Sequence, residues 1–285
     1  MDYSILKKKI DNISDLSTLT VVANNINQMT QNPKTSALDV ADAISQDPAL
    51  TARVLRIANS AIYGFPQKIS TIHHCIVILG FANIRNIIIT SSVFDKFPTK
   101  STNSQFDREG FWEHSLACAI TSKMIAKRLG MKKGDEAFIW GLLHDIGKVV
   151  LDTYFTFEFN SVIELIKEKD LHIRDAEEQV FGFDHATVGG IVAEKWNLPT
   201  VLIKAIRFHH YPSHANESTR MATIAHIADI LCRSKGIGNS GDNNVPAIEK
   251  ESIKLLGVDS QAMKQFLADM DEEFKSIDSF LPLIH

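Results

Sequence analysis

Apolar residues recur at three- and four-residue spacing along almost the whole chain, which is the periodicity of amphipathic α-helices. One early example is the row formed by Leu50, Val54 and Ala58. The β-branched stretch 84–89 could form a strand on residue propensity alone. We interpret it as a buried helix, because no second strand is available to pair with it. The sequence therefore predicts an all-α protein.

Capping residues mark the first of these helices. Ser36 with Asp39 resembles a capping box, in which each residue satisfies a backbone N–H of the other. Asp47-Pro48 is typical of an N-cap followed by proline in the first helical turn. A later helix, beginning near residue 70, is expected to stop at Gly80.

A polar stretch over residues 99–104 is the best candidate for a domain junction. We predict an N-terminal helical subdomain over residues 1–103, packed on a helical bundle over residues 104–235, with a C-terminal helical extension over residues 236–285. The bundle is expected to contain helices at about 108–129, 135–154, 185–196, 200–210 and 218–235. The glycines and asparagines of residues 236–244 predict a flexible loop.

Composition excludes several classes of protein. The formal charge is -4 and the basic residues do not cluster, so a broad nucleic-acid-binding face is not predicted. The cysteines lie far apart with no CxxC spacing, which indicates reduced, mostly buried thiols. Residues 1–13 lack the apolar core of a signal peptide, and the purely apolar runs are too short to span a bilayer. We expect a cytoplasmic protein that binds neither nucleic acid nor membrane.

Histidine and aspartate recur on the inward faces of the helices predicted in the second half: His114, His144, Asp145, His185, His209, His210 and Asp229. A buried carboxylate is costly unless a cation or a metal compensates it. No lysine or arginine recurs often enough to neutralise both Asp145 and Asp229, so we expect metal ligation. Imidazole and carboxylate without thiolate suit one or two divalent ions (Fe, Mn, Ni, Co or Zn) in octahedral-like coordination. Asp145 is the natural bridge between two ions.

Two further residues have open roles. Lys148 follows His144 by one helical turn and could face a bound phosphate, which makes it the candidate catalytic residue. It could equally be a solvated lysine near a helix end. His226 precedes Asp229 by three residues and could be an outer ligand or hold a ligand in place. A core or surface histidine is the simpler interpretation of His226.

The order of these residues resembles a known superfamily. His114, His144-Asp145 and Asp229 look like the H…HD…D pattern of the HD superfamily of metal-dependent phosphohydrolases, and His185 with His209-His210 extends the likeness to its HD-GYP branch. More specific is the string DPALTARVLRIANSAIYG at residues 47–64, which resembles the HDOD family, the HD-related output domain. The same family is resembled by further segments, at residues 111–115, 141–148, 183–185 and 207–210. Together, the likeness covers about residues 14–235.

The resemblance implies a bacterial signalling role, with partner proteins from two-component or cyclic-dinucleotide pathways. An enzymatic activity is generally not established for the HDOD family, and many members lack metal ligands, whereas this chain holds the whole His/Asp set. The likeness to HD-GYP is incomplete: no DGxGYP loop follows His209-His210, and Gly110 stands where a three-metal site would have glutamate. Both departures disfavour hydrolysis of cyclic di-GMP and favour at most two metal ions.

Three functions are compatible with these features. The favoured one is a regulatory output module that metal stabilises or switches without turnover. The second is a metal-dependent phosphohydrolase acting on a nucleotide or phosphodiester, with His209 or His210 and Lys148 facing the substrate. The third is a di-iron redox or oxygen sensor. The sequence predicts no oligomeric state.

Overall fold

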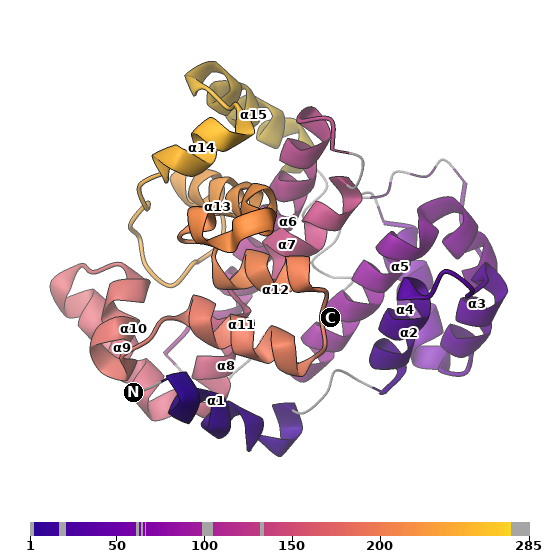
Figure 1. The fold of residues 1–285 in the computed structure, drawn as a ribbon, viewed down its shortest axis with the longest axis horizontal. Coiled ribbons are helices and arrows are strands. Elements are labelled where there is room, and N and C mark those ends of the chain that lie inside the picture. Colours follow the sequence, from indigo (N-terminus) through magenta and orange to yellow (C-terminus); the bar gives the residue numbers. More distant parts are fainter. Residues whose placement is uncertain are drawn as a thin grey trace. The chain divides into compact units, whose positions relative to one another are not determined.

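The computed structural model of this chain describes residues 3–16, 21–60, 63, 65, 67–98, 105–131 and 134–274. Every regular element among them is a helix, which confirms the all-α prediction (Figure 1). The α-helices are α1 (Tyr3–Asp11), α2 (Val21–Gln31), α3 (Ala37–Ser45), α4 (Pro48–Ala58), α5 (Ile72–Lys96), α6 (Arg108–Arg128), α7 (Ala137–Leu143), α8 (Ile146–Tyr154), α9 (Thr156–Lys169), α10 (Ile173–Phe181), α11 (His185–Lys195), α12 (Thr200–Arg207), α13 (Thr219–Ser234), α14 (Lys250–Leu256) and α15 (Ser260–Glu273). Short 3-10 helices are η1 (Ser14–Leu16), η2 (Gly134–Glu136) and η3 (Pro212–Ser218).

The chain divides into two compact units. The smaller unit comprises residues 18–96 and 273–285, and the larger unit comprises residues 1–17 and 97–272. This division differs from the predicted boundary after residue 103, and the polar stretch 99–104 itself lies outside the described residues. The larger unit also takes in α14 and most of α15, which the prediction had set apart as an extension.

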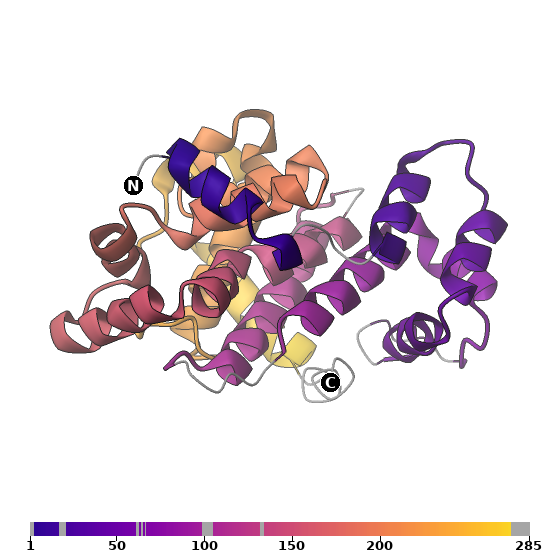
Figure 2. The same cartoon turned by 90° about the horizontal axis from the view of Figure 1, so that it is seen from below.

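Helix α1 belongs to the larger unit because its apolar face is buried there. Leu6 and Ile10 are fully buried, and α1 packs against α11 (Figures 1 and 2). Lys195, the last residue of α11, donates from Nζ to the carbonyl oxygens of Ile10 and Asp11 at 2.8 Å. These bonds satisfy carbonyl groups at the C-terminal end of α1 that have no partner within the helix. The first helix is therefore fastened to the unit that contains the His/Asp residues.

The smaller unit contains α2 to α5, and its capping follows the sequence signals. Asp39 N donates to Ser36 Oγ at 3.2 Å and Ser36 N donates to Asp39 Oδ2 at 2.8 Å, which confirms the capping box. Asp47 Oδ1 accepts from the backbone N–H groups of residues 49 and 50 at 3.0 Å. Gly80 has φ 76, so the helical conformation stops there as expected, but helix resumes directly after it within α5.

Helix α5 is the one helix of the described residues that is long and apolar enough to cross a membrane, judged by length and composition. Of its most apolar window, 61% is buried inside the structure, and Gly80 interrupts it. Residues 84–89 lie within α5, which confirms a buried helix there rather than a strand. Burial of this kind is typical of a core helix.

Within the larger unit, α6, α7, α8, α11, α12 and α13 surround the His/Asp residues. The helix predicted over residues 135–154 is broken at His144-Asp145 into α7 and α8. Two glycines allow close approach of these helices to their neighbours. A Cβ on Gly141 would lie 2.2 Å from the carbonyl oxygen of Cys118, and one on Gly147 would lie 1.9 Å from that of His185. Glycine at both positions brings the residues of α6 and α11 within reach of the break.

Candidate metal centre

The seven predicted ligands come together from five places in the larger unit. Helix α6 supplies His114, the break between α7 and α8 supplies His144 and Asp145, and α11 begins with His185. His209 and His210 follow the end of α12, and α13 supplies Asp229. Six of them are 2% exposed or less, and His210 is half-buried. The structure thus brings together every side chain that the sequence singled out as a ligand.

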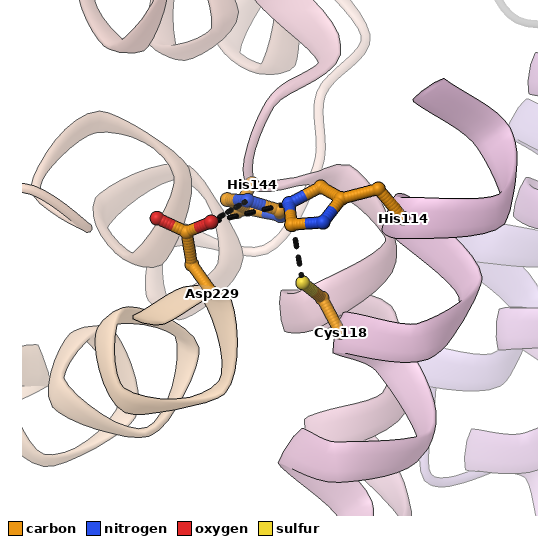
Figure 3. Close-up of side chains that lie close together, drawn as sticks. All are labelled: His114, Cys118, His144 and Asp229. Atoms are coloured by element: carbon orange, nitrogen blue, oxygen red, sulfur yellow. Dashed lines mark hydrogen bonds and ion pairs between the residues drawn. The ribbon is translucent and has the colours of Figure 1, made fainter. Parts of the chain in front are cut away.

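One group of side chains forms around Asp229 (Figure 3). Its Oδ1 lies 3.1 Å from His114 Nε2 and 3.9 Å from His144 Nε2. Cys118 belongs to the same group, with its Sγ 3.5 Å from His114 Nε2. Four donor atoms, one from each of these residues, all lie within 4.8 Å of one another. That spacing is compatible with one metal ion.

Asp145 links this group to a second one. Its Oδ2 lies 3.2 Å from His144 Nε2, whereas its Oδ1 lies 3.0 Å from His185 Nε2 and 3.4 Å from His209 Nε2. The Nε2 atom of His210 is 2.9 Å from that of His185. The two oxygens of one carboxylate therefore face two different sets of imidazoles, which is the arrangement of a bridging ligand.

Four of the imidazoles are held in one tautomer by groups that can only accept a hydrogen bond. The Nδ1 atoms of His144 and His209 donate to the carbonyl oxygens of Gly141 and Ile206, at 2.7 Å and 2.8 Å. His114 Nδ1 donates to the carbonyl of Ile237 at 3.3 Å, and His185 Nδ1 donates to Glu177 Oε2 at 2.6 Å. In the neutral form of each ring, Nε2 is the nitrogen without a proton, and its lone pair is directed at the centre, as in histidines that bind metal.

Unsatisfied acceptor atoms remain at the centre. Among the described residues, His144 Nε2, His209 Nε2 and Asp145 Oδ1 are buried without a hydrogen bond of acceptable geometry. These three residues form another set whose donor atoms lie within 4.8 Å of one another. Buried acceptor atoms that face each other are unfavourable unless a proton or a metal cation lies between them. The residues therefore fit a divalent cation.

The two carboxylates are strongly biased towards the charged form. Burial opposes ionisation of Asp145, but His144, Lys148 and His185 outweigh it and hold the pKa of Asp145 well below its usual range. Burial likewise opposes ionisation of Asp229, but the adjacent imidazoles of His114 and His144 outweigh it and hold the pKa of Asp229 well below the usual range. Both groups are therefore anionic ligands at neutral pH.

The imidazoles respond differently according to their neighbours. Burial disfavours the charged form of His144, but the carboxylates of Asp145 and Asp229 outweigh it and raise its pKa to about 10. Glu177 and Asp145 overcome burial in the same way and raise the pKa of His185 to about 9. Burial dominates at His209 and lowers its pKa to about 4. The centre thus attracts positive charge most strongly around the two aspartates.

Lys148 is not the solvated lysine that one interpretation of the sequence offered. It is 1% exposed, and its Nζ donates to Asp145 Oδ2 at 2.5 Å and to the carbonyl of Ser240 at 2.8 Å. A lysine therefore neutralises part of the charge that we had assigned to metal alone. Helical spacing could not reveal this, because Ser240 lies 92 residues further along the chain.

Residues 236–244 form an anchored segment, which corrects the prediction of a flexible loop. Besides the carbonyl groups of Ile237 and Ser240, the backbone N–H of Asn239 donates to the carbonyl of Gly110 at 2.7 Å. Asp242 pairs with the buried side chain of Arg233 and accepts from the backbone N–H of residue 173 at 2.8 Å. A Cβ on Gly110 would lie 2.7 Å from that of Asn239, so this segment leaves no room for a side chain there.

Other residues at the centre were missed or left open by the sequence. Glu177 is fully buried and accepts from both the ring and the backbone N–H of His185; a carboxylate in a helix of mixed polarity carries no signal of such a role. Burial raises the pKa of the Cys118 thiol well above its usual range, and Cys232 adds to this effect.

His226 accepts a hydrogen bond from the backbone N–H of Glu249 at 3.0 Å through Nε2, and it belongs to none of the candidate metal-binding groups among the described residues. Its contacts are those of a core histidine.

Comparison with known proteins relates these features to other chains. An uncharacterized protein of Treponema pallidum (strain Nichols) is 30% identical over 220 residues, which are 75% of this chain and 42% of the relative. Ribonuclease Y of Mycoplasma mycoides is 30% identical over 122 residues, 43% of this chain and 22% of the relative. The chain thus spans less than half the length of these curated relatives.

The fold has a close counterpart among solved structures. An HDOD domain protein of unknown function from Geobacter sulfurreducens aligns with a TM-score of 0.81 and 26% identity, over 99% of this chain and 98% of that one. The family model described as HDOD domain matches residues 16–212. This range includes α4, which begins at Pro48, and all of the ligand candidates except Asp229. This chain therefore belongs to the HDOD domain family.

Proposed function

We propose that this chain is a regulatory output module of the HDOD type, whose larger unit binds one or two divalent cations without turnover. Family membership and the convergent imidazole and carboxylate groups support the proposal. Cation binding would stabilise the folded state, because donor atoms from distant parts of the sequence come together only in that state. Partners from bacterial two-component or cyclic-dinucleotide signalling and a cytoplasmic location belong to the proposal and rest on the family alone.

The observation that carries the absence of turnover is the position of Lys148. As a catalytic residue, Lys148 would have to direct its ammonium group at a substrate phosphate. Here its ammonium group is buried between Asp145 and the carbonyl of Ser240. Breaking a buried ion pair costs about 3–5 kcal/mol, and a phosphate would also have to displace the anchored segment 236–244. This arrangement favours a cation site over a catalytic centre.

Two sets of ligands would share Asp145. The first would consist of His114, His144, Asp229 and Asp145 Oδ2, and the second of Asp145 Oδ1, His185, His209 and His210. Imidazole and carboxylate donors suit Fe, Mn, Ni, Co or Zn.

The test is the metal content of the full chain, purified without chelator, together with an assay for turnover. We expect about one to two equivalents of divalent metal, as one bridging carboxylate allows. His144→Ala and Asp145→Ala should each lose most of it. His214→Ala is the matched control, because His214 is exposed and lies outside the centre. Nucleotides and a chromogenic phosphodiester, incubated with metal-loaded protein, should remain intact.

Two results would contradict this proposal in different ways. Metal-free wild-type protein with undiminished stability would remove the cation site and leave the family assignment standing. Phosphodiester cleavage by the wild type that Asp145→Ala abolishes would establish the second candidate function instead.

That second candidate is a metal-dependent phosphohydrolase, and one observation favours it. His210 lines a cavity of about 400 Å³ together with Arg174, whose guanidinium lies 5.1 Å from the centre of the Tyr211 ring. A cationic and aromatic wall beside candidate ligands could hold a nucleotide. A bound cation would supply an activated water and polarise a phosphate oxygen. The name of the Mycoplasma mycoides relative, a ribonuclease, is consistent with such chemistry. The di-iron sensor stays a prediction.

A further inference from the structure

Cys118 adds a sulfur atom to the group around Asp229. It follows His114 by four residues on α6, so both side chains project from the same face of the helix. Figure 3 shows the sulfur directed at the His114 ring, beside His144 and Asp229. All four residues are buried. The sequence predicted a site without thiolate and interpreted the cysteines as reduced, mostly buried thiols.

Three distances between donor atoms of this group can be compared with the edges of a tetrahedron around a metal ion. In a tetrahedral site, metal–nitrogen and metal–oxygen bonds of about 2.0 Å place nitrogen and oxygen about 3.3 Å apart. A metal–sulfur bond of about 2.3 Å places sulfur and nitrogen about 3.5 Å apart. The sulfur–nitrogen distance here is 3.5 Å. The two nitrogen–oxygen distances are 3.1 Å and 3.9 Å, on either side of the ideal.

A second observation points to a ligand in this group. His144 Nε2 is fully buried and has no hydrogen-bond partner of acceptable geometry among the described residues, although its Nδ1 is satisfied. The thiol of Cys118 can donate to His114 Nε2, but a single S–H cannot also satisfy His144. A cation between the four donors would satisfy both imidazoles at once.

We propose that Cys118 binds as a thiolate in place of Asp145 Oδ2, which stays paired with Lys148. Cys118 then completes a tetrahedral site for zinc, or for cobalt in its place, with His114, His144 and Asp229. The proposal rests on the proposed function, because it requires that the larger unit binds a divalent cation. On binding, the S–H bond breaks, the sulfur keeps the electron pair for the metal, and one proton leaves to solvent. A mixed nitrogen, oxygen and sulfur set of this geometry selects zinc over manganese or magnesium.

Cobalt provides the test, because thiolate bound to Co²⁺ gives an intense charge-transfer absorption in the near ultraviolet. The full chain, stripped with chelator and titrated with Co²⁺, should develop this band together with the strong visible bands of tetrahedral cobalt. Zinc should displace the cobalt and remove both. Cys118→Ser should lose the near-ultraviolet band and bind Co²⁺ more weakly by more than about tenfold. Cys232→Ser should keep the band; it removes the other buried thiol close to Cys118.

The possible results separate this proposal from the one before it. Wild-type protein that binds Co²⁺ without the charge-transfer band would overturn the role of Cys118 and leave the cation site intact. The same holds if Cys118→Ser retains the band. Protein that takes up no Co²⁺ at all would overturn both proposals. The spectrum of the wild type decides the question even if the serine variant does not fold.

Discussion

Glu177 accepts two hydrogen bonds from His185, one from ring Nδ1 at 2.6 Å and one from the backbone N–H at 2.8 Å, both at the same carboxylate oxygen. The first bond orients the imidazole so that its Nε2 points at Asp145. The second ties the first residue of α11 to α10. A side chain that lies outside the candidate ligand set thus decides where one ligand points.

Glu177→Gln should therefore weaken divalent metal binding without unfolding the protein. The amide oxygen can take the place of the carboxylate oxygen that accepts both bonds, but the negative charge that favours the donor tautomer and orientation of His185 is lost. We expect zinc affinity to fall by about 10- to 100-fold, measured by calorimetric titration. Glu178→Gln is the control, because Glu178 is the exposed neighbour of Glu177. If the two variants bind zinc with equal affinity, Glu177 contributes only to the packing of α10 and does not orient His185 for metal binding.

Lys148→Met should destabilise the protein most when metal is withheld. The substitution leaves Asp145 buried without its ammonium partner, which costs about 3–5 kcal/mol. A divalent cation takes over the compensation, so excess zinc should restore much of the lost stability. Denaturant unfolding with chelator and with zinc measures both values. Lys204→Met, which removes the exposed ion pair with Glu217, should cost less than about 1 kcal/mol in either condition. A loss for Lys148→Met that zinc leaves unchanged would argue against a cation at Asp145.

Gly238→Ala should release the segment 236–244 from the centre. Gly238 has φ +63, and a Cβ there would lie 2.3 Å from the backbone nitrogen of His114. Gly236→Ala is the matched control: its φ is +65, but a Cβ there would meet nothing within 4 Å. Backbone strain alone costs about 1–2 kcal/mol in either variant. We expect only Gly238→Ala to exceed this cost and to become sensitive to limited proteolysis within the segment. Identical behaviour of the two variants would mean that the contact with His114 does not hold the segment.

The attachment of α1 should weaken in acid. Burial opposes the charge of Glu194, but Arg207 and Lys7 together outweigh it and lower the pKa of this carboxyl below its ordinary value of 4.5. A lowered pKa in the folded state means that the stabilisation is present above the unfolded value and is lost as the pH falls through the folded one. Amide exchange at Leu6 and Ile10 should therefore accelerate, relative to the rest of the larger unit, as the pH drops below about 4.5. In Glu194→Gln this pH dependence should disappear; its persistence would assign the effect to other carboxyl groups.

Much of the architecture was accessible from local patterns. The structure confirms the capping box at Ser36, the cap at Asp47 and the predicted helix at residues 84–89. These were predictable because capping and periodicity depend on residues within one or two helical turns. The break between α7 and α8 was not predicted, because the apolar pattern on either side of His144 and Asp145 is that of one long helix. Residues 236–244 were misjudged for a related reason. Glycine and asparagine indicate a backbone that can adopt many conformations. The contacts that restrain this segment come from α6, α8 and α13, which are distant in sequence or not visible from local composition.

The sequence by itself determined which side chains gather at the centre, because a carboxylate or imidazole among apolar residues must find a partner inside the fold. Only the tertiary structure decided how they are divided. In the folded protein, the two oxygens of Asp145 face different imidazoles, Lys148 is buried against Asp145, and Cys118 lies beside His114. These relations join residues as far apart as His114 and Asp229, separated by 115 positions. Their distances depend on how closely whole helices pack, which no local periodicity encodes.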